Sequence, residues 1–207
     1  ISATNSITSG NNANWLFIGP LDHFEWAVIP DQTAGGAFTV AITAKDASSN
    51  TTTLDSDGTS FTASESMTFT TTATAAPAGN KPTYAGDDLT DGTTVNVDLS
   101  TGSFTTDNII FYNAVTGQNL TITHSSKTGT SNNFAVDPET ASYLKITGFA
   151  TVTAEQENEL TITAYDQYGN IDTNYSSDVD LFFSGLFAAP DGTEPIVEVT
   201  EINNDFV

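Results

Sequence analysis

An internal repeat with a period the size of a domain constrains this chain more than any other feature of its sequence. The segment Ile42–Asp46 returns as Ile162–Asp166, at an offset of 120 residues (162 − 42). A second match relates Ala75–Pro82 to Ala188–Pro195, at an offset of 113 residues (188 − 75). Such a period is too long for a solenoid unit and is the length of a whole domain. The repeat therefore predicts that the chain is a piece of a tandem array of similar domains.

The same repeat sets the expected domain boundaries. Residues 20–140 are predicted to form one complete domain, and residues 141–207 a second, truncated one. Residues 1–19 are predicted to be the closing strand of a preceding repeat or a linker, because they hold too few apolar residues to bury a core. The sequence shows no initiating Met, signal peptide or cell-wall anchor, which is the pattern expected of an internal fragment or a processed form.

Apolar residues recur along the chain with a period of two, which is typical of β-strands. Residues 38–44 and 160–165 both alternate large apolar side chains with threonine or alanine, and threonine suits the solvated face of a pleated sheet. Turn-forming residues such as Asp55–Gly58 and Tyr168–Asn170 separate these runs. No segment has the length and pattern of an amphipathic helix. The predicted fold class is all-β, with antiparallel β-sandwich domains of roughly seven or eight short strands each.

The stretch Leu160–Asn170 carries a more specific pattern, LTITAYDQYGN, and it follows a turn at Thr153–Gln156. This pattern resembles the strand-and-turn signature of immunoglobulin-like repeats in large prokaryotic surface proteins, the invasin/intimin-type group. The resemblance covers residues 143–187 well and residues 22–46 loosely, and residues 46–50 of the first copy lack the Tyr-Gly-Asn triplet. It implies tandem immunoglobulin-like β-sandwich domains that are extracellular, repetitive and not enzymatic.

The residues of this signature have a structural explanation of their own. Gly169 and Asn170 can adopt the positive φ that closes a tight hairpin. Asp166 can accept hydrogen bonds from the turn amides in an Asx-type brace. We therefore expect Asp166, Gly169 and Asn170 to have a structural role in a turn rather than a catalytic one.

The charge of the chain excludes several classes of partner. There are 26 acidic residues against four lysines and no arginine, for a net charge of −22. Nucleic acids and anionic lipids both require a basic face, so neither is an expected partner. No run approaches the length of a membrane span, and the absence of cysteine excludes disulfides and thiolate metal sites.

Calcium is the one cofactor that the sequence suggests. Clustered aspartates such as Asp87, Asp88 and Asp91 supply the oxygen ligands that Ca²⁺ prefers, and similar clusters lie at residues 55–58 and 178–180. None has the spacing of an EF-hand or of a nonapeptide repeat. The competing interpretation is that so many carboxylates cluster by chance and form a solvated face. Asp87, Asp88 and Asp91 are the predicted ligands if a site exists.

Enzyme activity is not expected. The two histidines, His23 and His124, occupy non-equivalent positions of the repeat, and neither has metal-ligand spacing. No serine is placed with a base and an orienting group in a recognisable catalytic pattern.

Carbohydrate binding and glycosylation are further possibilities that the sequence raises. Trp15 and Trp26 could form a platform for stacking sugars, although Trp26 falls at an apolar strand position, which favours a place in the core, and Trp15 lies near the junction of two repeats. Glycosylation sequons occur at Asn50, Asn119 and Asn174, at a frequency expected by chance in a chain this rich in Ser and Thr.

Two function hypotheses follow. The first is a structural repeat of a large extracellular cell-surface protein, such as a stalk, adhesin, surface-layer or filament subunit. Its partners would be neighbouring repeats of the same polypeptide or identical subunits, with surface glycans as a further possibility. The alternative is an accessory carbohydrate-binding or spacer module of a secreted polysaccharide-active enzyme.

Overall fold

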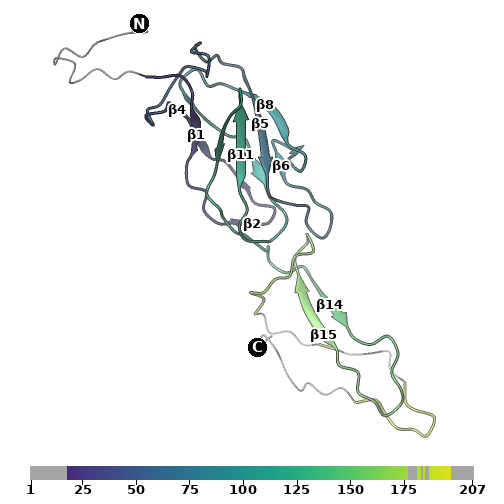
Figure 1. Cartoon of the computed structure of the whole chain (residues 1–207). Helices are drawn as coiled ribbons and strands as arrows, with labels where there is room; N and C mark the ends of the chain where they lie inside the picture. The colour runs from purple at the N-terminus through teal and green to yellow at the C-terminus, as the bar shows by residue number, and fades with distance from the viewer. Residues whose placement is uncertain (1–17, 177–180, 183, 185–186, 197–207) are drawn as a thin grey trace, which may run out of the picture.

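The computed structural model describes residues 18–176, 181–182, 184 and 187–196 (Figure 1). Every regular element within these residues is a β-strand, and all strand pairs are antiparallel except one. The all-β prediction is therefore confirmed, and the sheets are consistent with a β-sandwich. No helix of the length and hydrophobicity needed to cross a bilayer occurs in this part of the chain. Trp15 and most of the predicted linker at residues 1–19 lie outside the described residues.

We call residues 18–137 the first unit and the described residues from 138 onward the second unit. One sheet of the first unit has the order β1–β4–β9, made of β1 (His23–Trp26), β4 (Ala41–Lys45) and β9 (Ser103–Thr105). A second sheet, here the β11 sheet, has the order β12–β11–β5–β8, made of β12 (Lys127–Thr130), β11 (Leu120–His124), β5 (Glu65–Thr71) and β8 (Thr93–Val97).

Shorter strands complete the first unit. A sheet of order β3–β10–β6–β7 consists of β3 (Ala37–Phe38), β10 (Ile109–Ile110), β6 (Thr83–Tyr84) and β7 (Asp87–Asp88). The one parallel pair joins β2 (Gln32–Thr33) to β13 (Val136–Asp137). The regular strands of the second unit are β14 (Tyr143–Thr147) and β15 (Thr161–Tyr165), which pair with each other.

Apolar side chains from the β1–β4–β9 sheet and from the β11 sheet form the core of the first unit. In β11 the period-two pattern buries Leu120 and Ile122 and leaves Thr121 and Thr123 half-buried. Phe69 of β5 stacks on Tyr84 with ring centroids 4.6 Å apart and meets Trp26 edge-on at 6.1 Å. Burial of one such large side chain is worth about 1.5–3 kcal/mol, so these contacts hold the sheets together.

Strand β1 also packs beside β12, and this close approach requires a glycine. A Cβ on Gly129 would lie 2.2 Å from the carbonyl oxygen of Phe24. The indole nitrogen of Trp26 donates to the carbonyl of Gly129 at 2.9 Å. Trp26 is thus partly buried against the core of the first unit.

The hairpin β14–β15 has the same register as the pair β1–β4. Phe24 lies opposite Ala44 in the first unit, and Leu144 lies opposite Ala164 in the second. Both members of each pair are related by the repeat offset of 120 residues (144 − 24 and 164 − 44). The repeated sequence therefore forms the same local structure in both places.

Burial differs between the two copies. Ile29 and Val40 are 2% and 6% exposed in the first unit, whereas Phe149 and Leu160 at the equivalent positions are 72% and 45% exposed. The first unit covers these positions within its core, which includes side chains of the β11 sheet. The division into a domain at residues 20–140 and a second at 141–207 stays a prediction.

Candidate functional site at the junction of the two units

The turn that follows β15 is organised around the carboxylate of Asp166, which is fully buried. Its Oδ1 accepts hydrogen bonds from the backbone N–H of Tyr168 at 2.9 Å and of Asn170 at 2.8 Å. Its Oδ2 accepts from the N–H of Glu139 at 3.1 Å and from Nδ2 of Asn170 at 2.8 Å. Gly169 has a φ of 81°, whereas Asn170 is not among the residues of positive φ. Asp166 therefore joins the turn to the chain segment that enters the second unit.

Asn170 extends this turn onto the first unit. Its Nδ2 donates to the carbonyl of Tyr112 at 2.8 Å, and its Oδ1 accepts from the N–H of Ala114 at 2.9 Å. The side chain is 4% exposed. Because both ends of the amide bond to backbone groups of one loop, Asn170 fixes the position of the turn relative to that loop.

Tyr168 provides the apolar part of the same contact. Its ring lies edge-on to Tyr112 with centroids 5.0 Å apart, and its carbonyl accepts from the N–H of Ala78 at 2.9 Å. A Cβ on Gly35 would lie 2.1 Å from the Tyr168 hydroxyl oxygen, so the absence of a side chain at Gly35 makes room for the ring. The second unit is thus held by hydrogen bonds and by the packing of the Tyr168 ring, at the end of the first unit near β2 (Figure 1).

The first copy of the repeat contains an equivalent brace that sequence reasoning did not identify. Asp46 is 2% exposed, and its Oδ1 accepts from the N–H groups of Ser48 and Asn50, both at 2.9 Å. Its Oδ2 accepts from the N–H of Gly19 at 2.9 Å. The backbone N–H of Gly19, followed by the donors of Asn50 and Ser48, lowers the pKa of the Asp46 carboxyl from 3.8 to about 2. The repeat offset was the signal that could have found this residue, although Ser49 replaces the glycine of the second copy.

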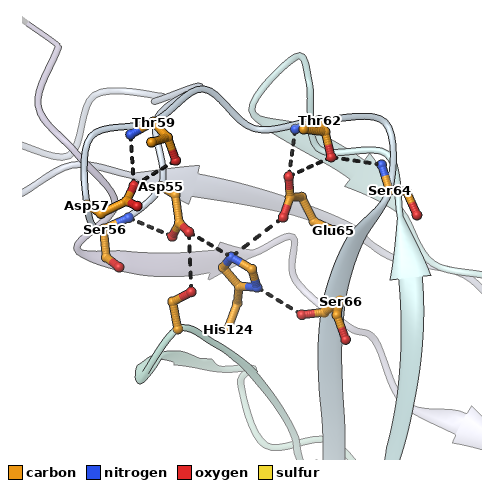
Figure 2. Close-up of polar contacts among 10 residues, drawn as sticks. Asp55, Ser56, Asp57, Thr59, Thr62, Ser64, Glu65, Ser66 and His124 are labelled. Carbon is orange, nitrogen blue, oxygen red and sulfur yellow. Dashed lines mark hydrogen bonds and ion pairs between the residues drawn. The ribbon is translucent and has the colours of Figure 1, made fainter.

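A second polar cluster surrounds His124, the last residue of β11 (Figure 2). His124 is 9% exposed, and its Nδ1 lies 2.8 Å from the carbonyl oxygen of Ser66, so Nδ1 carries a proton and donates. Its Nε2 lies 3.4 Å from Oδ2 of Asp55 and 3.9 Å from Oε2 of Glu65. Within the described residues, Nε2 has no hydrogen-bond partner. A proton on Nε2 would pair the ring with two carboxylates at once.

The other oxygen of each carboxylate accepts hydrogen bonds from nearby backbone N–H groups and, for Glu65, also from a hydroxyl group. Asp55 Oδ1 accepts from the N–H of Ser56 at 2.6 Å. Glu65 Oε1 accepts from the N–H and the hydroxyl of Thr62, both at 2.7 Å. The sequence offered only one signal for this cluster, which is that His124 continues the buried face of β11.

The three aspartates predicted to bind calcium lie in and beside strand β7. Asp87 and Asp88 form that strand, and Asp91 follows in an exposed turn. Asp88 forms an ion pair with Lys81 and accepts from the N–H of Thr90 at 2.8 Å, and the pair with Lys81 is the main reason that its pKa falls to about 2. In the part of the chain that the structure describes, no group of three or more carboxylate, histidine or cysteine side chains is arranged to hold a metal ion. The calcium site stays a prediction.

Comparisons with known proteins give one match. No protein-family model and no curated protein matches the chain. A solved structure, domains 4–9 of the surface layer protein SbsC, matches with 14% identity over 73% of this chain and a TM-score of 0.30. The chain spans 21% of the length of that structure. At this TM-score the likeness assigns neither a fold nor a function.

Proposed function

We propose that the chain is a non-enzymatic structural segment of a large extracellular cell-surface protein, built from tandem immunoglobulin-like β-sandwich repeats. In this role it is part of a stalk, adhesin, surface layer or filament. Its partners are neighbouring repeats of the same polypeptide or identical subunits.

The junction between the two units is the observation that carries this proposal. A flexible linker leaves consecutive domains free to reorient, whereas here the side chains of Asp166, Tyr168 and Asn170 are engaged at the boundary. Domain interfaces with few contacts allow relative motion by default. A junction braced by buried hydrogen bonds resists bending, which is what an extended load-bearing protein requires.

The composition supports an extracellular setting. A net charge of −22 causes strong self-repulsion, which dissolved salt screens over a Debye length of about 8 Å or less.

Surface labelling tests this proposal. Antibodies raised against the chain should bind intact cells of the source organism, and an externally added protease should remove the signal. A matched antibody against a cytoplasmic protein provides the control for cell integrity. Labelling that appears only after permeabilisation would overturn the proposal.

The accessory carbohydrate-binding module stays a separate hypothesis. Trp26, one of the two candidate platform residues, is packed against the core and donates its indole hydrogen to Gly129. No contact within the described residues favours a sugar platform.

A further inference from the structure

We propose that the turn at residues 46–50 is the docking surface for a preceding repeat of the same polypeptide. This inference rests on the proposed function and specifies the partner. The preceding repeat would present its equivalents of Gly35, Ala78 and the loop at residues 112–114, which are the groups that receive the second unit here.

The braces at Asp46 and Asp166 have the same hydrogen-bond pattern. Asp46 and Asp166 each accept from the amides two and four residues later, and each accepts from an amide 27 residues earlier. The flanking strands have the same register, and an isolated bridge follows each turn, Lys45 with Thr51 and Tyr165 with Ile171. The two turns are therefore the same structural device at two places in the chain.

Only one of the two turns is packed against a neighbouring unit. Asn170 is buried by Tyr112 and Ala114, whereas Asn50 is half-buried and Ser48 and Ser49 are exposed. Nδ2 of Asn50 lies 3.3 and 3.4 Å from the carboxylate oxygens of Asp46, as Asn170 lies against Asp166. No donor in the described part of the chain reaches Oδ1 of Asn50. The amide is held in the orientation that, in the second copy, meets a backbone loop.

The turn at residues 46–50 lies beside the entry of the chain into the first unit. The chain enters the first unit at the end away from the second unit (Figure 1), and Gly19 at this entry bonds to Asp46. A hollow of about 270 Å³ lies beside the turn, lined among others by Ala47, Ser48 and Lys127. The surface therefore faces the direction from which a preceding repeat would arrive, with space for a side chain from its loop.

The chemistry of the partner follows from the seated junction. Its essential groups are a backbone carbonyl and a backbone N–H two residues apart, as at Tyr112 and Ala114, which the Asn50 amide would bond. Ser48 replaces Tyr168, so the aromatic contact with Tyr112 is missing from this junction. We expect it to be weaker than the junction at Asp166.

A duplicated chain tests the proposal. Residues 1–137 are followed by residues 18–207, so that residue 18 takes the place of residue 138 and the spacing of the repeat (138 − 18 = 120) is kept. The chain has no cysteine, so engineered cysteines give no background. Tyr112→Cys in the first block and Ser48→Cys in the second place one thiol on each side of the new junction. The measurement is the rate of cross-linking by a short bismaleimide.

The cross-linking rate of the junction pair is compared with those of a control pair and of two further variants. The control pair replaces Tyr112→Cys with Ser125→Cys, which lies in the exposed turn between β11 and β12. We expect the junction pair to react about tenfold faster, because docking raises the local concentration of the thiols. Adding Asn50→Ala should lower that rate several-fold, whereas Asn96→Ala on the exposed face of β8 should not.

The junction at Asp166 in the same molecule separates the two possible failures. Its own pair, Tyr112→Cys in the second block with Tyr168→Cys, should cross-link rapidly. If this pair reacts and the Ser48 pair reacts no faster than its control, the docking surface is wrong while the proposed function stands. If neither pair reacts faster than the control, the braced tandem array itself is wrong.

Discussion

Asp46 and Asp166 accept the same set of backbone hydrogen bonds, and in both cases one of the donors lies 27 residues earlier in the chain. Each carboxylate thereby ties the entry of its unit to the turn after the second strand of the hairpin. Both side chains are buried, at 2% and 0% exposure. A short polar side chain therefore fixes where each unit begins relative to its hairpin.

Acid should weaken the brace at Asp46. Its pKa of about 2 in the folded chain lies below the ordinary 3.8, so the ionised form stabilises the folded state. This contribution is fully present above the unfolded pKa, and it is lost as the pH falls through about 2. We expect Asp46→Asn to melt below the unmodified chain near neutral pH, and the difference to shrink toward pH 2. Melting curves by circular dichroism across this range measure it.

Asp88 provides the comparison for that experiment, because its pKa is also lowered to about 2 but mainly by its pairing with the Lys81 side chain. Surface pairs are screened by salt. About 0.5 M NaCl should therefore reduce the effect of Asp88→Asn and leave that of Asp46→Asn. A difference between Asp46→Asn and the unmodified chain that does not change with pH would contradict the assignment.

Gly35→Ala should displace the second unit from its contact with the first unit. Its Cβ would fall 2.1 Å from the hydroxyl of Tyr168, so the ring must leave its place beside Tyr112. Gly117→Ala is the matched control, since Gly35 and Gly117 have φ of 76° and 75° and a Cβ on Gly117 meets nothing within 4 Å. Both variants carry the strain of a left-handed residue, about 1–2 kcal/mol, and only Gly35→Ala adds a clash.

Small-angle X-ray scattering distinguishes these two variants. We expect Gly35→Ala to broaden the distribution of intramolecular distances, and adding Tyr168→Ala to remove the clash without restoring the aromatic contact. Identical scattering from Gly35→Ala and Gly117→Ala would show that Tyr168 does not hold the junction.

The His124 cluster should behave as one electrostatic unit. The single change His124→Gln should destabilise the first unit, and so should the double change of Asp55→Asn with Glu65→Gln. Because the groups lie within 3.4 to 3.9 Å, the effects should not add, with a coupling of about 0.5–3 kcal/mol. Urea unfolding of the single and combined variants gives the cycle.

The neighbouring Asp57 supplies the control for this cycle. It bonds to the N–H and hydroxyl of Thr59, at 2.8 and 2.7 Å. The change Asp57→Asn should therefore add to His124→Gln without coupling. Equal coupling at Asp57 and at Asp55 with Glu65 would argue against a specific cluster.

Salt should raise the melting temperature of the chain, because a net charge of −22 repels itself at low ionic strength. At equal ionic strength, CaCl₂ should exceed NaCl by a modest amount if a calcium site exists. A specific site adds about 1.4 kcal/mol at ten times its Kd. Equal melting temperatures would rule out the calcium site, and Asp91→Asn with Asp87→Asn would locate it.

The all-β fold class and the repeat of residues 42–46 at residues 162–166 could be predicted from the sequence. Alternation in residues 160–165 predicted a strand, observed as β15, because side chains of a strand point to opposite faces, so a period of two is visible locally. The offset between Ile42 and Ile162 predicted two equivalent hairpins, since similar local sequences form similar local structure. The turn at Asp166 could be predicted for the same reason, because its donors from Tyr168 and Asn170 are close in sequence.

Which distant groups meet depends on the assembly of the strands into the tertiary structure. Asn170 reaches Tyr112 across 58 residues and His124 reaches Ser66 across another 58, so no local pattern reveals either contact. The Tyr168 ring likewise occupies the space that a side chain on Gly35 would need. Hydrogen bonds and close packing depend on distances between atoms that the chain brings together when it folds. The local pattern therefore determines the elements, and their assembly determines which side chains act at the junction.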